Sequence, residues 1–170
     1  MSRRASLAVC LVRKRNSKLE YSRLYREFFG LFCGPTHPLF GVSDLTKADL
    51  AGQAAVSFVT DRLEDALRSV TLMRADADLI DRVVGTSANL KEVRRMIIAG
   101  LGIGPLLVHV VRRDLDDGLL WRLPPYENLP GIDVHVVWNP SAKMNRAETA
   151  MLEMLLERIA GTPIEERTYR

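Results

Sequence analysis

Short apolar runs alternate with amphipathic segments along the chain. Continuous apolar runs are typical of strands that are buried on both faces of a sheet. Such runs, some with partial alternation, predict strands over residues 7–12, 28–33, 54–58, 80–85, 103–108 and 132–138. The segments between them predict helices or helical turns over residues 46–50, 60–70, 89–99, 110–115 and 139–160. This alternation predicts an α/β fold with a mostly parallel sheet.

The sequence also indicates where two of these helices begin and end. Asn89 is expected to cap the helix that follows it, with Glu92 in the capping-box position, and Gly100 is expected to end that helix. Asn139 and Pro140 are expected to begin the last helix, because proline is tolerated at the first helical position. The apolar stripe of the last helix consists of Met144, Ala147, Met151, Leu155 and Ile159, and Gly161 follows it.

The glycine-rich segment at residues 100–104, Gly-Leu-Gly-Ile-Gly, does not fit a nucleotide-binding loop. A dinucleotide fingerprint follows a strand and opens a helix, so that the helix N-terminus faces the phosphates. Here the glycines close a predicted helix and lead into a predicted strand, which favours a tight turn. The sequence shows no GxSxG motif, acid–base pair or other catalytic arrangement, and therefore predicts no enzyme.

Polar residues follow two predicted strands at points where a helix is expected to begin. Thr60 and Asp61 form the first junction; Thr86, Ser87, Ala88 and Asn89 form the second. In open α/β sheets the carboxyl ends of strands line the ligand crevice, and the following helix offers N–H groups to an anion. Taken alone, each junction is explained more simply as the cap of its helix, but two such junctions together favour binding.

Charge and composition add few constraints on function. The net charge is +3, and the basic residues are dispersed, which is typical of solvated faces more than of a nucleic-acid surface. The run Arg13-Lys14-Arg15 follows the first predicted strand and could attract an anionic effector, or could be a solvated charge run. The three histidines show no metal-ligand spacing, so we expect no metal and no cofactor. Cys10 and Cys33 lie in apolar stretches and are expected to be small buried residues.

The chain is expected to stay in the cytoplasm. No apolar run approaches the roughly 20 residues of a membrane helix. A signal peptide is disfavoured because Arg13-Lys14-Arg15 stands where small residues and a cleavage site should lie.

Several short sequence motifs follow one another along the chain in a characteristic order. His-Pro-Leu at residues 37–39 precedes Leu-Thr-Lys-Ala-Asp-Leu-Ala-Gly at residues 45–52, and residues 93–104 end in Ala-Gly-Leu-Gly-Ile-Gly. Residues 115–120 and residues 134–138 with the last helix follow them. In this order and spacing they resemble the "HPL … LTLADLAG", "VAAGLGIALLP" and closing segments of the LysR substrate-binding domain of LysR-type bacterial transcription regulators. The proline that ends the family's "VAAGLGIALLP" motif is replaced here by Val108 or a near neighbour.

The resemblance implies a two-lobed α/β fold like that of periplasmic binding proteins of type 2, with a small-molecule effector between the lobes. Residues 1–51 and 122–161 would form lobe I, residues 52–121 lobe II, and residues 162–170 a tail. Effector contacts of the family in lobe II fall at strand-to-helix junctions, which here are Thr60 and the segment from Thr86 to Asn89. A further contact of the family lies near the first crossover, and the resemblance implies Val12 and Arg13 for it here. The effector is expected to be a small anionic metabolite.

A complete family member carries a helix-turn-helix, a linker helix, and two strands and two helices of lobe I before the segment that resembles Leu7 and its successors. We therefore expect an N-terminally truncated domain with lobe I incomplete, which reaches DNA only through a helix-turn-helix that this chain lacks. Its open sheet edges could promote self-association or mixed dimers with full-length relatives. Two other interpretations stay open: an interaction fragment without a ligand, and a solute-binding lobe for transport, which the missing secretion signal disfavours.

Overall fold

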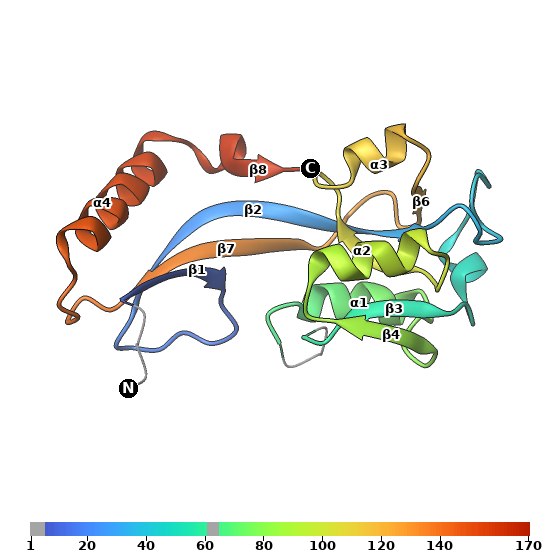
Figure 1. Cartoon of the computed structure of the whole chain (residues 1–170), viewed down its shortest axis with the longest axis horizontal. Coiled ribbons are helices and arrows are strands. Elements are labelled where there is room, and N and C mark those ends of the chain that lie inside the picture. The colour runs from blue at the N-terminus through green and yellow to red at the C-terminus, as the bar shows by residue number, and fades with distance from the viewer. Residues whose placement is uncertain (1–5, 61–64) are drawn as a thin grey trace. The chain divides into compact units, whose positions relative to one another are not determined.

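The chain forms strands and helices that alternate over most of its length (Figure 1). A computed structural model describes residues 6–60 and 65–170. The strands are β1 (Leu7–Leu11), β2 (Glu20–Cys33), β3 (Ala55–Phe58), β4 (Val83–Ser87), β5 (Gly104–Leu107), β6 (Trp121–Leu123), β7 (Gly131–Trp138) and β8 (Thr168–Tyr169). The helices are α1 (Arg68–Asp76), α2 (Leu90–Ile98), α3 (Arg112–Asp116) and α4 (Arg146–Gly161), with short 3-10 helices η1 (Lys47–Leu50) and η2 (Ile164–Arg167).

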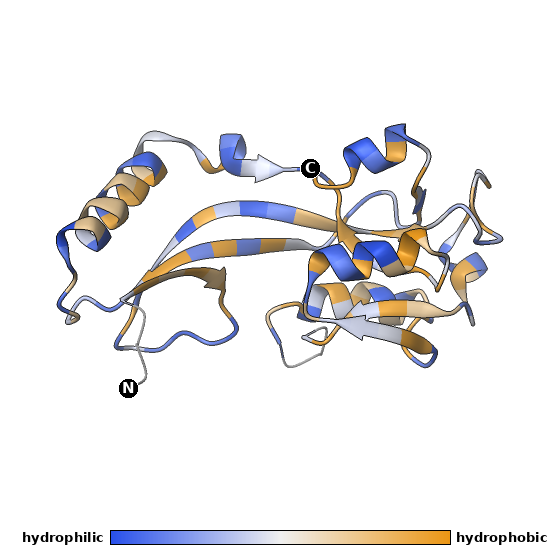
Figure 2. Cartoon of the chain, viewed as in Figure 1, coloured by the Kyte–Doolittle hydropathy of each residue, from blue (hydrophilic) through white to orange (hydrophobic). Residues whose placement is uncertain are grey.

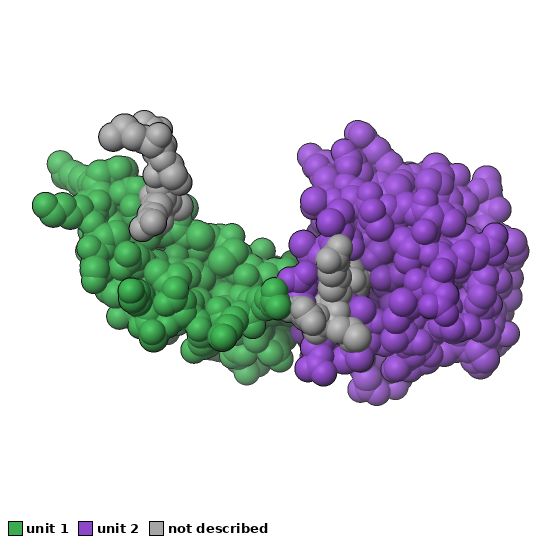
Figure 3. Space-filling model, turned by 90° about the horizontal axis from the view of Figure 1, so that it is seen from below, with its two compact units in different colours: residues 1–27, 132–169 green, residues 28–131, 170 purple. Residues whose placement is uncertain are grey.

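These elements pack into two compact units (Figure 3). Unit 1 contains the residues up to Glu27 and Ile132–Tyr169, and unit 2 contains Phe28–Gly131 and Arg170. Strand β2 begins in unit 1 and ends in unit 2, and the chain returns to unit 1 within β7. Residues 28–51 and 122–131, which the sequence analysis assigns to lobe I, pack in unit 2. The lobe boundaries themselves stay a prediction.

Unit 2 is built around the end of β2. Leu31 pairs with Pro105 of β5 on one side and with Leu123 of β6 on the other, both antiparallel. A two-stranded sheet pairs β3 with β4 in parallel, and Ala55 forms an isolated parallel bridge to Ile103, next to β5. Helix α2 packs against β3, β4 and β5. The core of unit 2 consists of fully buried side chains, among them Leu31, Phe32, Val56, Val70, Val93, Ile97, Leu106 and Leu123.

Helix α2 begins and ends where the sequence predicts. The Asn89 side chain accepts a hydrogen bond from the Lys91 N–H, 2.8 Å away, as an N-cap does. Gly100 follows the helix with a φ of 79°, a left-handed conformation that favours glycine. A Cβ at Gly102 would lie 2.4 Å from the carbonyl oxygen of Ala54, so the neighbouring backbone can approach only a glycine there. Residues 100–104 thus form the predicted tight turn from helix to strand.

Unit 1 is held together by strand pairing and by arginine contacts. Strand β1 runs antiparallel to β7, with Leu7 opposite Trp138. The Arg26 guanidinium in β2 donates two hydrogen bonds to the Asp133 carboxylate in β7, at 2.7 and 2.9 Å. These bonds hold the pKa of the Asp133 carboxyl below its usual value. Arg167 donates to the carbonyl oxygens of Arg23, Leu24 and Thr162, and so ties the C-terminal segment to β2.

Helix α4 keeps its side chains accessible. It contains no buried residue, and Met151 and Met154 are 48% and 60% exposed. Apolar and polar residues alternate along it, and β1 is apolar over most of its length (Figure 2). Val9 of β1 is also 48% exposed. Unit 1 therefore presents apolar side chains on both elements.

The predicted start of the last helix is wrong. Helix α4 begins at Arg146, and its N-cap is Asn145, whose side chain accepts from the N–H groups of Ala147 and Glu148. The Glu148 carboxylate accepts in return from the Asn145 N–H, which completes a capping box. Asn139 instead accepts from the Ser141 N–H in a turn. The two hydrogen bonds of the capping box fix the start of the helix at Asn145, whereas proline is only tolerated at a first helical position.

Two predicted elements of unit 2 are displaced along the chain. The helix expected over residues 60–70 is α1, Arg68–Asp76; Asp61, one of its expected caps, lies outside the described residues. Of its buried apolar positions, Val70 lies at the end of the expected segment and Met73 lies beyond it. The strand expected over residues 80–85 is β4, Val83–Ser87. Its extent is set by its pairing with β3, and Ile80 lies outside it and is exposed.

Two expectations about the sheets are also wrong. Strand pairs β1–β7, β2–β5 and β2–β6 are antiparallel, whereas β3–β4, β2–β8 and the Ala55–Ile103 bridge are parallel, so the sheets are not mostly parallel. Strand β1 is not buried on both faces, because it lies at the edge of its sheet with β7 as its described neighbour. For the same reason Cys10 is exposed, whereas Cys33 at the end of β2 is buried as expected.

His37 gives the stability of unit 2 a pH dependence. Its ring is buried, its Nδ1 accepts from the Leu39 N–H at 3.2 Å, and burial lowers its pKa. As pH falls through about 6.5, the unfolded chain takes up a proton that the folded chain refuses, so unfolding is favoured. We expect the free energy of unfolding in urea to fall between pH 7.5 and pH 5.

The variant His37→Asn isolates this contribution. Its amide oxygen can still accept from Leu39, but it does not titrate, so the decrease in stability towards pH 5 should be smaller. Part of the decrease will persist, because burial also lowers the pKa of His109. Identical pH profiles for the variant and the native chain would contradict the assignment.

Candidate functional site

The two strand-to-helix junctions expected to bind an effector lie at the same edge of the small sheet. Strands β3 and β4 are parallel, with Phe58 opposite Ser87, and the Val59 N–H donates to the Ser87 carbonyl oxygen at 3.2 Å. Thr60 follows β3, and Ala88 and Asn89 follow β4. The structure thus brings Thr60 and the segment Thr86–Asn89 together within unit 2.

Polar groups of the second junction already bind one another. The Ser87 hydroxyl accepts from the Asn89 N–H at 3.0 Å and donates to the Glu92 carboxylate. The capping box that the sequence predicts between Asn89 and Glu92 is therefore not formed. Glu92 binds the side chain of Ser87 instead. Thr60, Thr86 and Ala88 are exposed. Capping of α2 accounts for Ser87 and Asn89, and leaves the two threonines accessible to a ligand.

A small hollow lies beside Thr86. It has a volume of about 290 Å³ and is lined by Ser57, Phe58, Val59, Thr71, Arg74, Ile80, Val83 and Thr86. Arg74 is buried and donates to the Ser57 hydroxyl at 2.8 Å and to the Leu79 carbonyl oxygen at 2.7 Å. This arginine therefore cross-links β3 to the segment after α1, and it also lines the hollow.

Val12 and Arg13 belong to unit 1. They follow β1 directly; Val12 is half-buried and Arg13 is exposed. Among the sequence-predicted site residues, the structure therefore groups those of unit 2 with one another, and places these two in the other unit.

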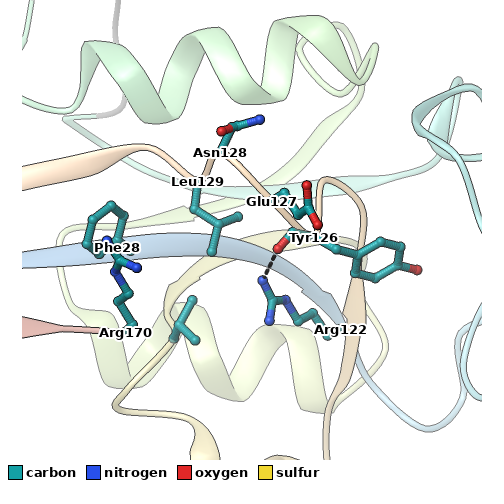
Figure 4. A pocket seen from close by; sticks show the side chains of 8 residues that line it. Phe28, Arg122, Tyr126, Glu127, Asn128, Leu129 and Arg170 are labelled. Atoms are coloured by element: carbon teal, nitrogen blue, oxygen red, sulfur yellow. Dashed lines mark hydrogen bonds between the residues drawn. The ribbon is translucent and has the colours of Figure 1, made fainter.

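A larger hollow in unit 2 was not predicted (Figure 4). Its volume is about 720 Å³, within the range of about 300–1,000 Å³ typical of small-molecule sites. It is lined by Phe28, Val108, Arg122, Tyr126, Glu127, Asn128, Leu129 and Arg170. These residues come from β2, from the residue after β5, from the segment at and after β6, and from the end of the chain. No local sequence signal joins such distant positions, so the hollow could not be predicted from the sequence.

The described residues contain no group of three or more His, Cys, Asp or Glu side chains that could hold a metal ion. Among the same residues, no helix has the length and apolar character needed to cross a membrane.

A family model, the LysR substrate binding domain, matches residues 1–160. The chain belongs to this family. LysR substrate-binding domains are the effector-binding regulatory domains of LysR-type transcription regulators, and they are not an enzyme family. The predicted recognition is confirmed. No curated protein matches the sequence.

Solved structures confirm the fold of this LysR substrate-binding domain. The regulatory domain of HypT from Salmonella typhimurium, in its apo form, is 17% identical, with a TM-score of 0.68 over 92% of this chain and 72% of that one. The effector-binding domain of QuiR in complex with shikimate is 14% identical, with a TM-score of 0.70 over 92% and 72%. The regulatory domain of CcmR from Synechocystis PCC6803 in complex with 2-PG is 16% identical, with a TM-score of 0.68 over 93% and 75%. The chain has the periplasmic-binding-protein-like α/β fold of type 2.

Proposed function

We propose that this domain senses a small anionic metabolite and passes the signal to a transcription regulator. The observation that carries the proposal is the family match over residues 1–160. The ligands named for the QuiR and CcmR domains, shikimate and 2-PG, support a small polar molecule. In this proposal a helix-turn-helix outside these 170 residues makes the DNA contacts, and the chain works in the cytoplasm, where the regulated DNA lies.

The proposed effector contacts are Thr60, Thr86, Ser87, Ala88 and Asn89 in unit 2, and Val12 and Arg13 in unit 1. Their support is partly geometric, since parallel pairing of β3 with β4 groups the first five at one sheet edge. Arg13 is exposed, and it supplies positive charge after β1. The hydroxyls of Thr60 and Thr86 are the groups we expect to bind the effector directly, because both residues are exposed.

Ligand-induced thermal stabilisation tests this function. A ligand at a hundred times its Kd stabilises the folded state by about 2.7 kcal/mol. For a domain of this size such a gain corresponds to a rise in Tm of roughly 5–10 °C. We expect a rise of this order in a thermal melt with at least one member of a panel of small acids that includes shikimate and 2-PG.

Two matched variants locate the binding site. Thr86→Val keeps the β-branched shape and removes the hydroxyl, so the stabilisation by the same ligand should shrink. Thr149→Val removes a hydroxyl on α4 that binds the Asn145 carbonyl oxygen, and should leave the stabilisation unchanged. If neutral analogues stabilise the chain as well as the acids do, the effector is not anionic.

We also propose that the isolated chain self-associates, or pairs with full-length relatives. Support comes from the exposed apolar side chains of unit 1, Val9 on β1 and Met151 and Met154 on α4. Strand β1 has an open edge among the described strands, which favours pairing with another chain. We expect the average mass in sedimentation velocity to rise with concentration, and the double variant Met151→Lys/Met154→Lys to reduce that rise. A concentration-independent monomer would contradict the proposal.

A further inference from the structure

The 720 Å³ hollow of unit 2 combines positive charge with apolar walls. Two guanidinium groups, those of Arg122 and Arg170, line it, and Glu127 supplies its one side-chain carboxylate. Phe28, Val108 and Leu129 supply apolar surface. Figure 4 shows the ring of Tyr126 directed away from Phe28 and Leu129.

Arg122 is oriented but is not paired with an anion. Its Nη2 donates to the Tyr126 carbonyl oxygen at 2.7 Å, a contact drawn in Figure 4. Within residues 6–60 and 65–170, that oxygen is its hydrogen-bond acceptor, and no carboxylate forms an ion pair with it. A guanidinium fixed at one nitrogen keeps its other terminal N–H groups in a defined direction, which suits charge-assisted hydrogen bonds to a carboxylate.

Arg170 lines the hollow beside Phe28. Its guanidinium carbon lies 5.3 Å from the centroid of the Phe28 ring, and its main-chain carboxylate oxygen accepts from the Arg112 guanidinium at 2.9 Å. Its side chain also has no carboxylate partner in the described part of the chain. Neither guanidinium forms an ion pair with Glu127 in the described part of the chain, so both can attract an anion into this partly apolar cavity.

We propose that this hollow is a second ligand site, which takes a small carboxylate with an apolar body. The acid group binds the guanidinium of Arg122, while the body packs against Leu129, Val108 and the Phe28–Arg170 stack. The site shares no lining residue with the junctions at Thr60 and Thr86, so it does not rest on the effector site proposed above.

Isothermal titration calorimetry on the 170-residue chain tests the proposal with three probes. Phenylacetate carries both features, phenylacetamide has the same shape without the charge, and inorganic phosphate has charge without an apolar body. We expect saturable binding of phenylacetate at concentrations up to about 5 mM, and at least roughly tenfold weaker binding of the other two. Equal affinity for the amide, or no saturable binding of phenylacetate in that range, overturns the proposal.

Variants assign the binding to this hollow. Arg122→Gln should weaken phenylacetate binding roughly tenfold and Arg170→Gln by a few-fold, because charge-assisted hydrogen bonds are about twice as strong as neutral ones. Arg95→Gln removes the same charge from an exposed position on α2 and should change nothing. If Arg122→Gln does not fold, Arg122→Lys and Arg170→Gln replace it. Equal losses in Arg95→Gln and the pocket variants would place the binding elsewhere and overturn the proposal.

Discussion

Replacing Phe32 with alanine is expected to lower the free energy of unfolding by about 3–5 kcal/mol. Phe32 is fully buried, and it lies in β2 between Gly104 of β5 and Arg122 of β6. Truncation removes the ring and leaves a cavity that surrounding strands can close only partly, since hydrogen-bonded ladders hold them on both sides. Because whole domains are stable by about 5–15 kcal/mol, this loss would remove a large share of the free energy of unfolding.

Urea unfolding followed by circular dichroism measures this loss. Met154→Ala is the matched control, because it removes a large apolar side chain that is 60% exposed, and it should change stability by less than about 0.5 kcal/mol. A change below about 1 kcal/mol for Phe32→Ala would show that the strands around it collapse into the vacated volume.

Replacing Arg94 with methionine should destabilise unit 2 by about 2–4 kcal/mol. Arg94 on α2 donates two hydrogen bonds to the carboxylate of Asp114 on α3, one of them at 2.5 Å from Nε to Oδ2. Asp114 is buried, and hydrogen bonding to it raises the pKa of the Arg94 guanidinium. Without Arg94, the carboxylate stays in a poorly solvated position with no countercharge. The estimate lies below that for a fully buried pair because Arg94 is about one-third exposed.

A double variant distinguishes the effect of an unpaired carboxylate from the effect of lost packing. The double variant Arg94→Met/Asp114→Leu removes both charges, and should be more stable than Arg94→Met alone. Arg113→Met is the control, because Arg113 is 91% exposed in its 3.5 Å pair with Asp117, and such surface pairs contribute about 0–1 kcal/mol. If the double variant is no more stable than the single one, the uncompensated carboxylate is not the cause.

Elements with local signals could be predicted from the sequence, and elements decided by distant partners could not. Helix α2 has its cap at Asn89, its buried face and its terminating Gly100 within twelve residues, so its limits were correct. The first half of β2, Glu20–Glu27, is polar and was missed, because its pairing with β8 is not visible in its composition. The start of α4 could have been found from Asn145 and Glu148, whose three-residue spacing is that of a capping box.

The candidate sites divide in the same way. Thr60 and Thr86 stand at strand ends that a general rule for α/β sheets identifies, so the sequence was enough to propose them. Arg122 and Arg170 are 48 residues apart and have no motif, and only the tertiary structure brings both to one cavity. A pocket assembled from separate segments needs the fold before it can be recognised.

The contrast between the two cysteines provides a means of labelling the native chain. Cys33 is buried, and burial raises the pKa of its thiol to about 12, so the reactive thiolate is scarce at neutral pH. Cys10 is exposed on β1. A maleimide fluorophore will therefore attach to Cys10 in preference to Cys33, without any substitution. The dye then reports from the strand whose open edge is proposed to receive another chain, and energy transfer between differently labelled molecules would reveal that pairing.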